Sequence, residues 1–228
     1  MGIGSDGILE VTTVTGTQAE IVIWNPDGTT AELSGNGTRI VARWLAGRTG
    51  SQEVTVWVGT RRILGRMRGG VTVETDVGEV VVSPLETIDV EGEQIELTPV
   101  SVGNPHAVVR RTADREELLR LGPRIEGHPR FPNRTNVQLV AVESTSALTV
   151  AVWERGVGET LSSGTSACAA AAAAIANGWC KSPITVHLPG GALTVAIDSG
   201  WNATLTGPAE EICRGSASRE FLARLAAG

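Results

Sequence analysis

The stretch ELSGNGTRIVARWLAG (residues 32–47) sets a Ser-Gly-Asn-Gly turn directly before a run with helical spacing. The same order returns in LSSGTSACAAAAAAIANG (161–178). In each copy a tryptophan stands ten residues before the serine, Trp24 before Ser34 and Trp153 before Ser163. Because each unit reads as strand, Ser-Gly turn, helix and hairpin, the repeat predicts two similar halves related by a pseudo-twofold axis. Chance recurrence of strand-turn-helix units in a β-rich chain is the alternative.

Most of the remaining sequence consists of short β-branched segments bounded by Gly, Asp or Pro, which predict strands. These segments cover residues 7–14, 18–25, 53–59, 62–83, 94–102, 106–110, 136–144, 147–154, 183–198 and 202–207. LPGGAL (188–193) reads as a hairpin turn inside one of them, and SPLETIDVEGE (83–93) reads as rich in turns. The predicted helices cover residues 37–46, 113–125, 166–177 and 216–227. The predicted class is therefore strand-dominated α+β.

The internal repeat also predicts the domain organisation. We place a boundary near Ser83–Pro84, after a strand and before the segment rich in turns. This gives an N-terminal domain at 1–83 and a C-terminal domain at 84–205. A return strand and a tail helix follow at 206–228.

The composition is that of an ordinary globular protein, with 41% hydrophobic residues, 19% charged residues and a net charge of −6. An acidic chain lacks the clustered basic face that nucleic acids and membrane surfaces require. We find no signal peptide, and no apolar run reaches the roughly 20 residues that a spanning helix needs, so we expect a cytoplasmic protein. Cys168, Cys180 and Cys213 lack metal-ligand spacing. They predict free thiols that pack as small hydrophobic side chains, with no zinc site.

The two turns predict a site for an anion. A glycine-rich helix start leaves backbone N–H groups pointing outward, and the helix dipole adds positive potential there. Gly35, Gly37 and Gly164 allow a ligand to approach the backbone closely. Ser34 and Ser163 would then stand beside the same small molecule, one at each helix. Two ordinary helix caps are the alternative.

Further polar residues stand where a core would not place them. They are Asn25, Asn104, His106, Asn136, Glu154 and Arg155. Together they supply a guanidinium for a carboxylate, and amide and carboxylate oxygens for an ammonium group, which suits recognition of an amino acid. Taken singly, each of them could equally be a turn residue or a solvent-facing group.

These motifs resemble those of the diaminopimelate epimerases. The resemblance rests on WNPDGTTAELSGNGTRIVARWL, VGNPHAVV, RTNVQLV and VWERGVGETLSSGTSACAAAAAAIANG, with GIGSDGILEV near the start. It implies two pseudo-symmetric domains, each a mixed sheet or barrel wrapped around a central helix, with the active-site cleft between them. It also implies a homodimer that acts in lysine biosynthesis, with proton transfer at an amino-acid α-carbon by two residues and without pyridoxal phosphate or a metal.

The resemblance assigns a role to each matching residue. Ser34 and Ser163 fall at the acid/base positions, assisted by His106 and Glu154. Gly35, Asn36, Gly164 and Thr165 match the turns that hold the substrate carboxylate. The positions that contact the rest of the substrate are matched by Asn25, Asn104, Asn136, Glu154 and Arg155.

Two features depart from the family pattern. The family has cysteine at both acid/base positions, whereas this sequence has serine at both. A thiol ionises near pH 8.5 but a hydroxyl only far higher, so two-thiol chemistry does not carry over directly. The family also has an N-terminal strand and a substrate-contacting loop before GIGSDG, which this sequence lacks.

The leading hypothesis is therefore a diaminopimelate-epimerase-like isomerase that turns over poorly with two serines. One alternative is a non-catalytic amino-acid-binding protein built on the same fold. The other is a racemase or epimerase of a different amino acid.

Overall fold

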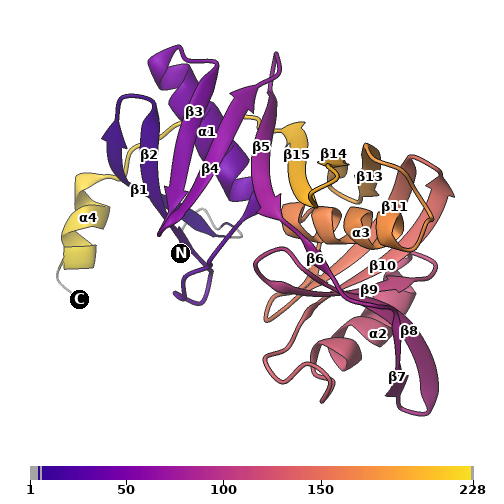
Figure 1. Cartoon of the computed structure of the whole chain (residues 1–228). Helices are drawn as coiled ribbons and strands as arrows, with labels where there is room; N and C mark the ends of the chain where they lie inside the picture. Colours follow the sequence, from indigo (N-terminus) through magenta and orange to yellow (C-terminus); the bar gives the residue numbers. More distant parts are fainter. Residues whose placement is uncertain (1–4, 6, 227–228) are drawn as a thin grey trace.

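The computed structural model describes Ser5 and residues 7–226, arranged in two sheet-rich halves that each pack a long helix against their strands (Figure 1). Most of the GIGSDG motif (2–7) and the last residue of the predicted tail helix (216–227) lie outside the described residues.

The first half is a sheet with one helix packed on it. It runs β1 (Ile8–Thr15), β2 (Gln18–Trp24), α1 (Gly35–Thr49), β3 (Glu53–Val58), β4 (Arg61–Met67) and β5 (Thr72–Glu79). β1 and β2 pair antiparallel, β2 and β3 pair parallel across α1, and β3, β4 and β5 continue antiparallel. Helical spacing places Val41, Ala42 and Leu45 on one face of α1, where they are buried in one cluster with strand residues such as Val54 and Val56.

The second half repeats this arrangement strand for strand. It runs β10 (Asn136–Ser144), β11 (Ala147–Glu154), α3 (Gly164–Ala176), β13 (Ile184–Leu188), β14 (Gly191–Ile197) and β15 (Asn202–Pro208). β10 and β11 pair antiparallel, β11 and β13 pair parallel across α3, and β14 and β15 follow antiparallel. A register shift interrupts the first hairpin of each half, in β1 and in β10. The duplication that the two turns predicted is confirmed.

The two halves share one continuous sheet, because β15 pairs antiparallel with β5. In the sequence, β5 and β10 are separated by β6 (Val81–Val82), β7 (Glu86–Val90), β8 (Glu93–Ser101), β9 (Pro105–Arg110) and α2 (Arg115–Glu126). β8 and β9 extend the second half's sheet beside β10. β12 (Gly158–Thr160) pairs with β11, and α4 (Arg219–Ala226) follows an extended segment near the C-terminus.

Helix α3 is the centre of the second half (Figure 1). Its residues 167–174 are fully buried, and it contacts β8 to β11 as well as β13 to β15. A helix that is apolar on every side needs neighbours on every side, and alanine side chains let the strands approach closely. On the opposite face of β8, β9 and β10, α2 buries Leu118, Leu121 and Ile125. Both faces of this part of the sheet are therefore covered.

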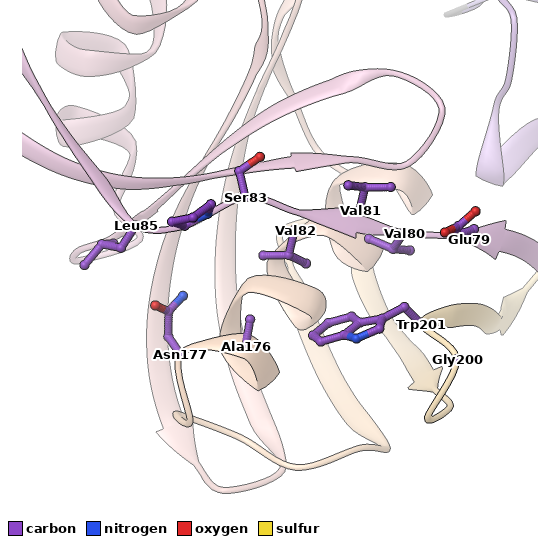
Figure 2. Close-up of a pocket in the computed structure, with 11 residues that line it drawn as sticks. Glu79, Val80, Val81, Val82, Ser83, Leu85, Ala176, Asn177, Gly200 and Trp201 are labelled. Carbon is purple, nitrogen blue, oxygen red and sulfur yellow. The ribbon is translucent and has the colours of Figure 1, made fainter.

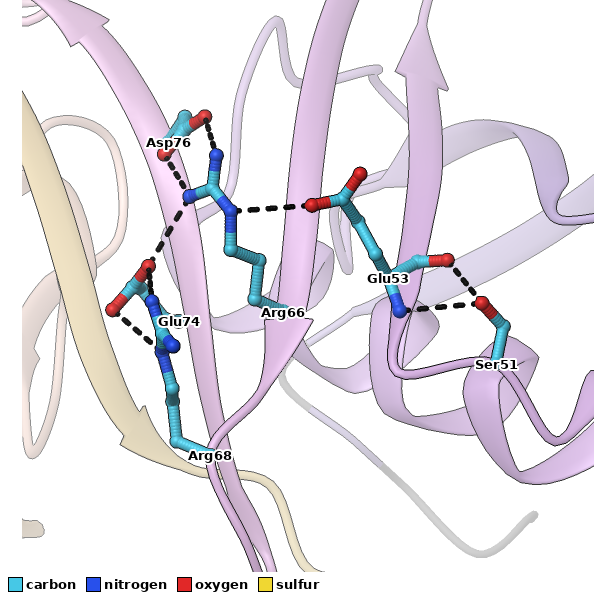
Figure 3. A network of polar contacts seen from close by, with 6 residues as sticks. All are labelled: Ser51, Glu53, Arg66, Arg68, Glu74 and Asp76. Carbon is cyan, nitrogen blue, oxygen red and sulfur yellow. Dashed lines mark hydrogen bonds and ion pairs between the residues drawn. The ribbon is translucent and has the colours of Figure 1, made fainter.

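The strands of the first half carry a charged network (Figure 3). Arg66 contacts Asp76, Glu74 and Glu53 at 2.8, 3.1 and 3.4 Å, and Arg68 contacts Glu74 at 2.6 Å. Because most of these side chains are partly exposed, the network contributes little to stability. We interpret it as the solvated face of this half.

Four details differ from the sequence-based expectations. The two central helices begin at Gly35 and Gly164, two residues earlier than predicted, because Ser34 and Ser163 are the residues that cap them. The segment 83–93 is not mainly turns: β7 pairs with β8 and buries Ile88 and Val90 on one face. The predicted strand 62–83 is three separate strands, β4, β5 and β6. Cys168 and Cys180 are buried as expected, but Cys213 is exposed in the segment before α4.

The remaining predicted strands and helices are present with small shifts at their ends, including the hairpin at 188–193. None of the helices in the described part of the chain is long and apolar enough to cross a membrane.

Candidate active site

The two serines occupy equivalent positions at the N-termini of α1 and α3. Ser34 has φ −135° and ψ 115°, and its Oγ accepts a hydrogen bond from the Gly37 amide at 3.0 Å. Ser163 has φ −139° and ψ 121°, and its Oγ accepts from the Ser166 amide at 3.5 Å. Both hydroxyls therefore cap a helix at its positive end, where an anion is favoured.

The two helix N-termini also lie against each other. A Cβ built on Gly35 would lie 2.8 Å from the Cα of Gly164. Beside this contact the Asn36 Nδ2 donates to the carbonyl of Ser162 at 3.0 Å, across the two halves. The amide groups of both turns are thus concentrated at one place, as an anion site formed from two helices requires.

A buried cation lies next to this place. Arg39 is 4% exposed, and its guanidinium donates to the Gly35 carbonyl and to the Asn36 Oδ1, both at 2.9 Å. Its Nε has no hydrogen-bond partner, and no described acidic side chain forms an ion pair with it. Burial lowers the pKa of Arg39 to about 10, although the nearby Cys168 opposes the shift. The guanidinium is still charged at neutral pH, and it adds to the positive potential of the two helix ends.

A chain of buried polar groups runs beneath the second turn. His106 Nε2 contacts the Asn104 Oδ1 at 2.9 Å, and Gln138 Nε2 contacts His106 Nδ1 and Ser166 Oγ, each at 3.0 Å. Burial lowers the pKa of His106 to about 3, against the opposing hydrogen bond from Gln138. The imidazole is therefore neutral, with Nε2 as its donor and Nδ1 as its acceptor. In this form it is suited to hold Asn104 and Gln138 in place.

The loop that carries Glu154 and Arg155 is held by two buried side chains. Asn136 Oδ1 accepts from the Arg155 amide at 2.9 Å, and its Nδ2 donates to the Pro105 carbonyl at 2.8 Å. Glu126, at the end of α2, accepts from the Trp153 indole at 2.7 Å and from the Gly156 amide at 2.9 Å. The Arg155 side chain itself is exposed, while its backbone is fixed at two neighbouring amides.

The described contacts of Asn25 lie outside these networks. Asn25 donates to Thr29 Oγ1 at 2.9 Å, inside its own turn, and none of the described contacts links it to the other candidates. Gly164 and Thr165 are buried in the first turn of α3, and Glu154 is half-buried at the end of β11.

Sequence reasoning missed four polar residues of this region: Arg39, Glu126, Gln138 and Ser166. The clearest signal was Gln138, a polar side chain in the middle of the apolar strand segment NVQLVAV. It is fully buried, and its Nε2 finds partners in His106 and Ser166, while its Oε1 has none among the described residues. Arg39 and Glu126 are charged residues on helices, so they read as solvent-facing until their burial is known.

A separate pocket of about 540 Å³ lies where the chain passes between the halves (Figure 2). β6, the segment 83–85, the end of α3 and Trp201 line it. None of the candidate residues named above is among its described lining residues. The two helix N-termini therefore remain the candidate active site.

The fold is shared with solved racemases and epimerases. A structure described as a probable proline racemase from Agrobacterium radiobacter, with bound carbonate, matches with a TM-score of 0.69 and 18% identity, over 93% of this chain and 75% of that one. A structure described as a predicted epimerase from Pseudomonas aeruginosa matches with a TM-score of 0.68 and 18% identity, over 89% and 80%. At such low identity the likeness defines the fold class alone.

Sequence comparison defines the family. The family model for diaminopimelate epimerase matches residues 98–212. The diaminopimelate epimerase of Desulfitobacterium hafniense is 36% identical over 94% of this chain and 83% of its own length. That of Stutzerimonas stutzeri is 38% identical over 85% and 76%. The chain belongs to the diaminopimelate epimerase family, as the motifs predicted.

Proposed function

We propose that this chain is an amino-acid isomerase that interconverts L,L- and meso-diaminopimelate by proton transfer at the α-carbon, a step of lysine biosynthesis. The observation that carries the proposal is the matched pair of helix N-termini, capped by Ser34 and Ser163, in a member of this family. Two-sided proton transfer needs one group on each face of the α-carbon, and a duplicated turn supplies such a pair.

We assign the substrate carboxylate to the amide groups at the starts of α1 and α3, from Gly35, Asn36, Gly164 and Thr165. The contact between the two turns supports this assignment, because it brings these donors to one place. None of the described ion pairs involves these four residues. Arg155, Glu154 and the amides of Asn25, Asn104 and Asn136 are assigned to the remainder of the substrate. Glu154 and the neutral imidazole of His106 would assist the acid/base pair.

The two hydroxyls limit the expected rate. Each pKa unit by which a site must lower the pKa of an acid/base group costs about 1.4 kcal/mol. A serine hydroxyl starts far above a thiol, so helix termini of ordinary strength do not make it an efficient base. We therefore expect slow exchange of the α-proton in this chain, with substrate binding retained.

Three further properties belong to the proposal. The domains divide near Ser83–Pro84 into 1–83 and 84–205, with a return strand and tail helix at 206–228. The repeated strand order on either side of Ser83 supports the first division, whereas β15 (Asn202–Pro208) runs across the second. The chain forms a homodimer, as the family resemblance suggests, and acts in the cytoplasm. Light scattering at micromolar concentration tests the dimer.

The test of function is incorporation of deuterium at the α-carbon of L,L-diaminopimelate in D₂O, followed by NMR. We expect slow incorporation by the native chain and faster incorporation by the double variant Ser34→Cys, Ser163→Cys. Ser199→Cys with Ser216→Cys is the matched control, because both serines are exposed and outside the site. Calorimetry with the same amino acid measures binding in parallel. No exchange by the double variant, despite measurable binding, contradicts the proposal and favours a binding protein. Exchange of another amino acid instead would show that the substrate is wrong.

A further inference from the structure

Arg39 lies where three elements from both halves meet. It is the fifth residue of α1, and it packs against β15 so closely that a Cβ built on Gly207 would lie 3.4 Å from its Nε. Cys168, the fifth residue of α3, is its counterpart in the repeat and is buried near it. At this equivalent position of the repeat, the first half therefore has a guanidinium and the second half has a small thiol.

The burial of this guanidinium is not explained by an ion pair. The hydrogen bonds of its guanidinium both return to the first turn of its own helix, at Gly35 and Asn36. Taking a cation out of water without a carboxylate is unfavourable, and an apolar residue would pack there at lower cost. The position therefore needs the hydrogen bonds that an arginine makes, and stability alone does not account for it.

What these bonds hold is the Asn36 side chain. With its Oδ1 occupied by Arg39 at 2.9 Å, the amide is oriented so that Nδ2 faces the other half and donates to the Ser162 carbonyl at 3.0 Å. Ser162 directly precedes the Ser163 cap of α3. The bonds form a continuous link from Arg39 through Asn36 to the second turn.

We propose that Arg39 is a positioning residue that uses Asn36 to fix the second turn against the first, so that the N-termini of α1 and α3 face one ligand. The inference rests on the proposed function for its purpose, because two half-sites must keep a constant separation to serve both faces of one α-carbon. The link itself is a property of the ligand-free protein.

The test is amide hydrogen exchange of the ligand-free full chain, read in peptides that cover 158–168 and, separately, 35–49. In Asn36→Asp the carboxylate keeps an acceptor for Arg39 and favours the start of α1, but it loses the donor to Ser162. In Arg39→Met the donors to Asn36 are lost. We expect exchange in 158–168 to rise about fivefold in both variants, as for one lost hydrogen bond. The control Arg48→Met, on the exposed last turn of α1, leaves it unchanged.

Two results overturn the inference. One is faster exchange confined to 35–49, which would make Arg39 a local support of α1. The other is unchanged exchange at 158–168 in Asn36→Asp. Should Arg39→Met fail to fold, Arg39→Lys replaces it, since a single ammonium cannot serve Gly35 and Asn36 in the same geometry. Because no ligand is present, neither result depends on whether the chain binds diaminopimelate.

Discussion

Gly35 and Gly164 are in backbone contact, so that a Cβ built on Gly35 would lie 2.8 Å from the Cα of Gly164 and the reverse distance would be 2.9 Å. Both are the first residues of their helices. The contact explains why a glycine follows each capping serine: any side chain would separate the two helix N-termini. Close approach of the backbones, and not a left-handed conformation, is what requires glycine here.

We expect Gly164→Ala to destabilise the protein by about 1–3 kcal/mol, the range for overpacking a site that cannot relax. The added methyl group would meet backbone atoms of Gly35 and the Leu205 side chain, which is fully buried. Urea unfolding measures the change. Gly47→Ala is the matched control, because Gly47 lies in α1 with open space around it. That change should be neutral or stabilising by up to about 1 kcal/mol. Equal effects at the two positions would mean that the turns are not in contact.

Stability should fall as the pH drops from 6.5 towards 5. Burial keeps the pKa of His106 near 3, well below its unfolded value of 6.5. The unfolded chain therefore binds a proton in this range that the native chain does not, and stability is lost with falling pH. The loss for one such group is about 2 kcal/mol at pH 5. Urea unfolding at several pH values measures it.

The pH dependence can be assigned by substitution. His106→Gln should flatten the slope between pH 6.5 and 5, whatever it does to the absolute stability. His187→Gln, at an exposed position outside this hydrogen-bonded chain, is the comparison variant. The carboxyl groups of Glu74, Glu93 and Glu117 have lowered pKa values, so their contribution is lost only below about pH 4.5. A slope that survives in His106→Gln would show that His106 takes up a proton in the native state.

The sequence predicted the duplication well because local chemistry determines it. A capping serine, a glycine and an apolar helix form the same structure in both copies. Arg39 and Glu126 were not predictable in the same way. Their burial depends on β15, on Trp153 and on the loop after β11, which become neighbours only when the strands pair. The strand β7 was missed for a similar reason, since its pairing with β8 outweighs the turn-forming residues around it.

Glu126 should matter for both stability and ligand binding. Glu126→Ala leaves the Trp153 indole and the Gly156 amide without their acceptor, at about 1–3 kcal/mol for each buried donor that water does not reach. The loop with Arg155 would be released, so affinity for diaminopimelate should fall as well. Glu126→Gln keeps one acceptor oxygen and should lose less of both. Glu96→Ala, at an exposed position of β8, serves as the control. Calorimetry and urea unfolding on the same samples separate binding from stability, and intact affinity in Glu126→Ala would show that the loop is held by other contacts.

The thiol introduced by Ser34→Cys should have a pKa below the ordinary value of about 8.5, because the N-terminus of α1 stabilises a thiolate at the cap position. The rate of alkylation by iodoacetamide, followed against pH by peptide mass spectrometry, measures this pKa. Two native cysteines serve as reference thiols for this measurement. Cys213 is exposed, whereas burial raises the pKa of Cys168 to about 12 and should leave that thiol unreactive. A midpoint for the introduced thiol at or above that of Cys213 would show that the helix end does not favour an anion, and the proposed carboxylate site would lose its physical basis. A lower midpoint would show that the N-terminus of α1 favours an anion at the position of Ser34, as the proposed site requires.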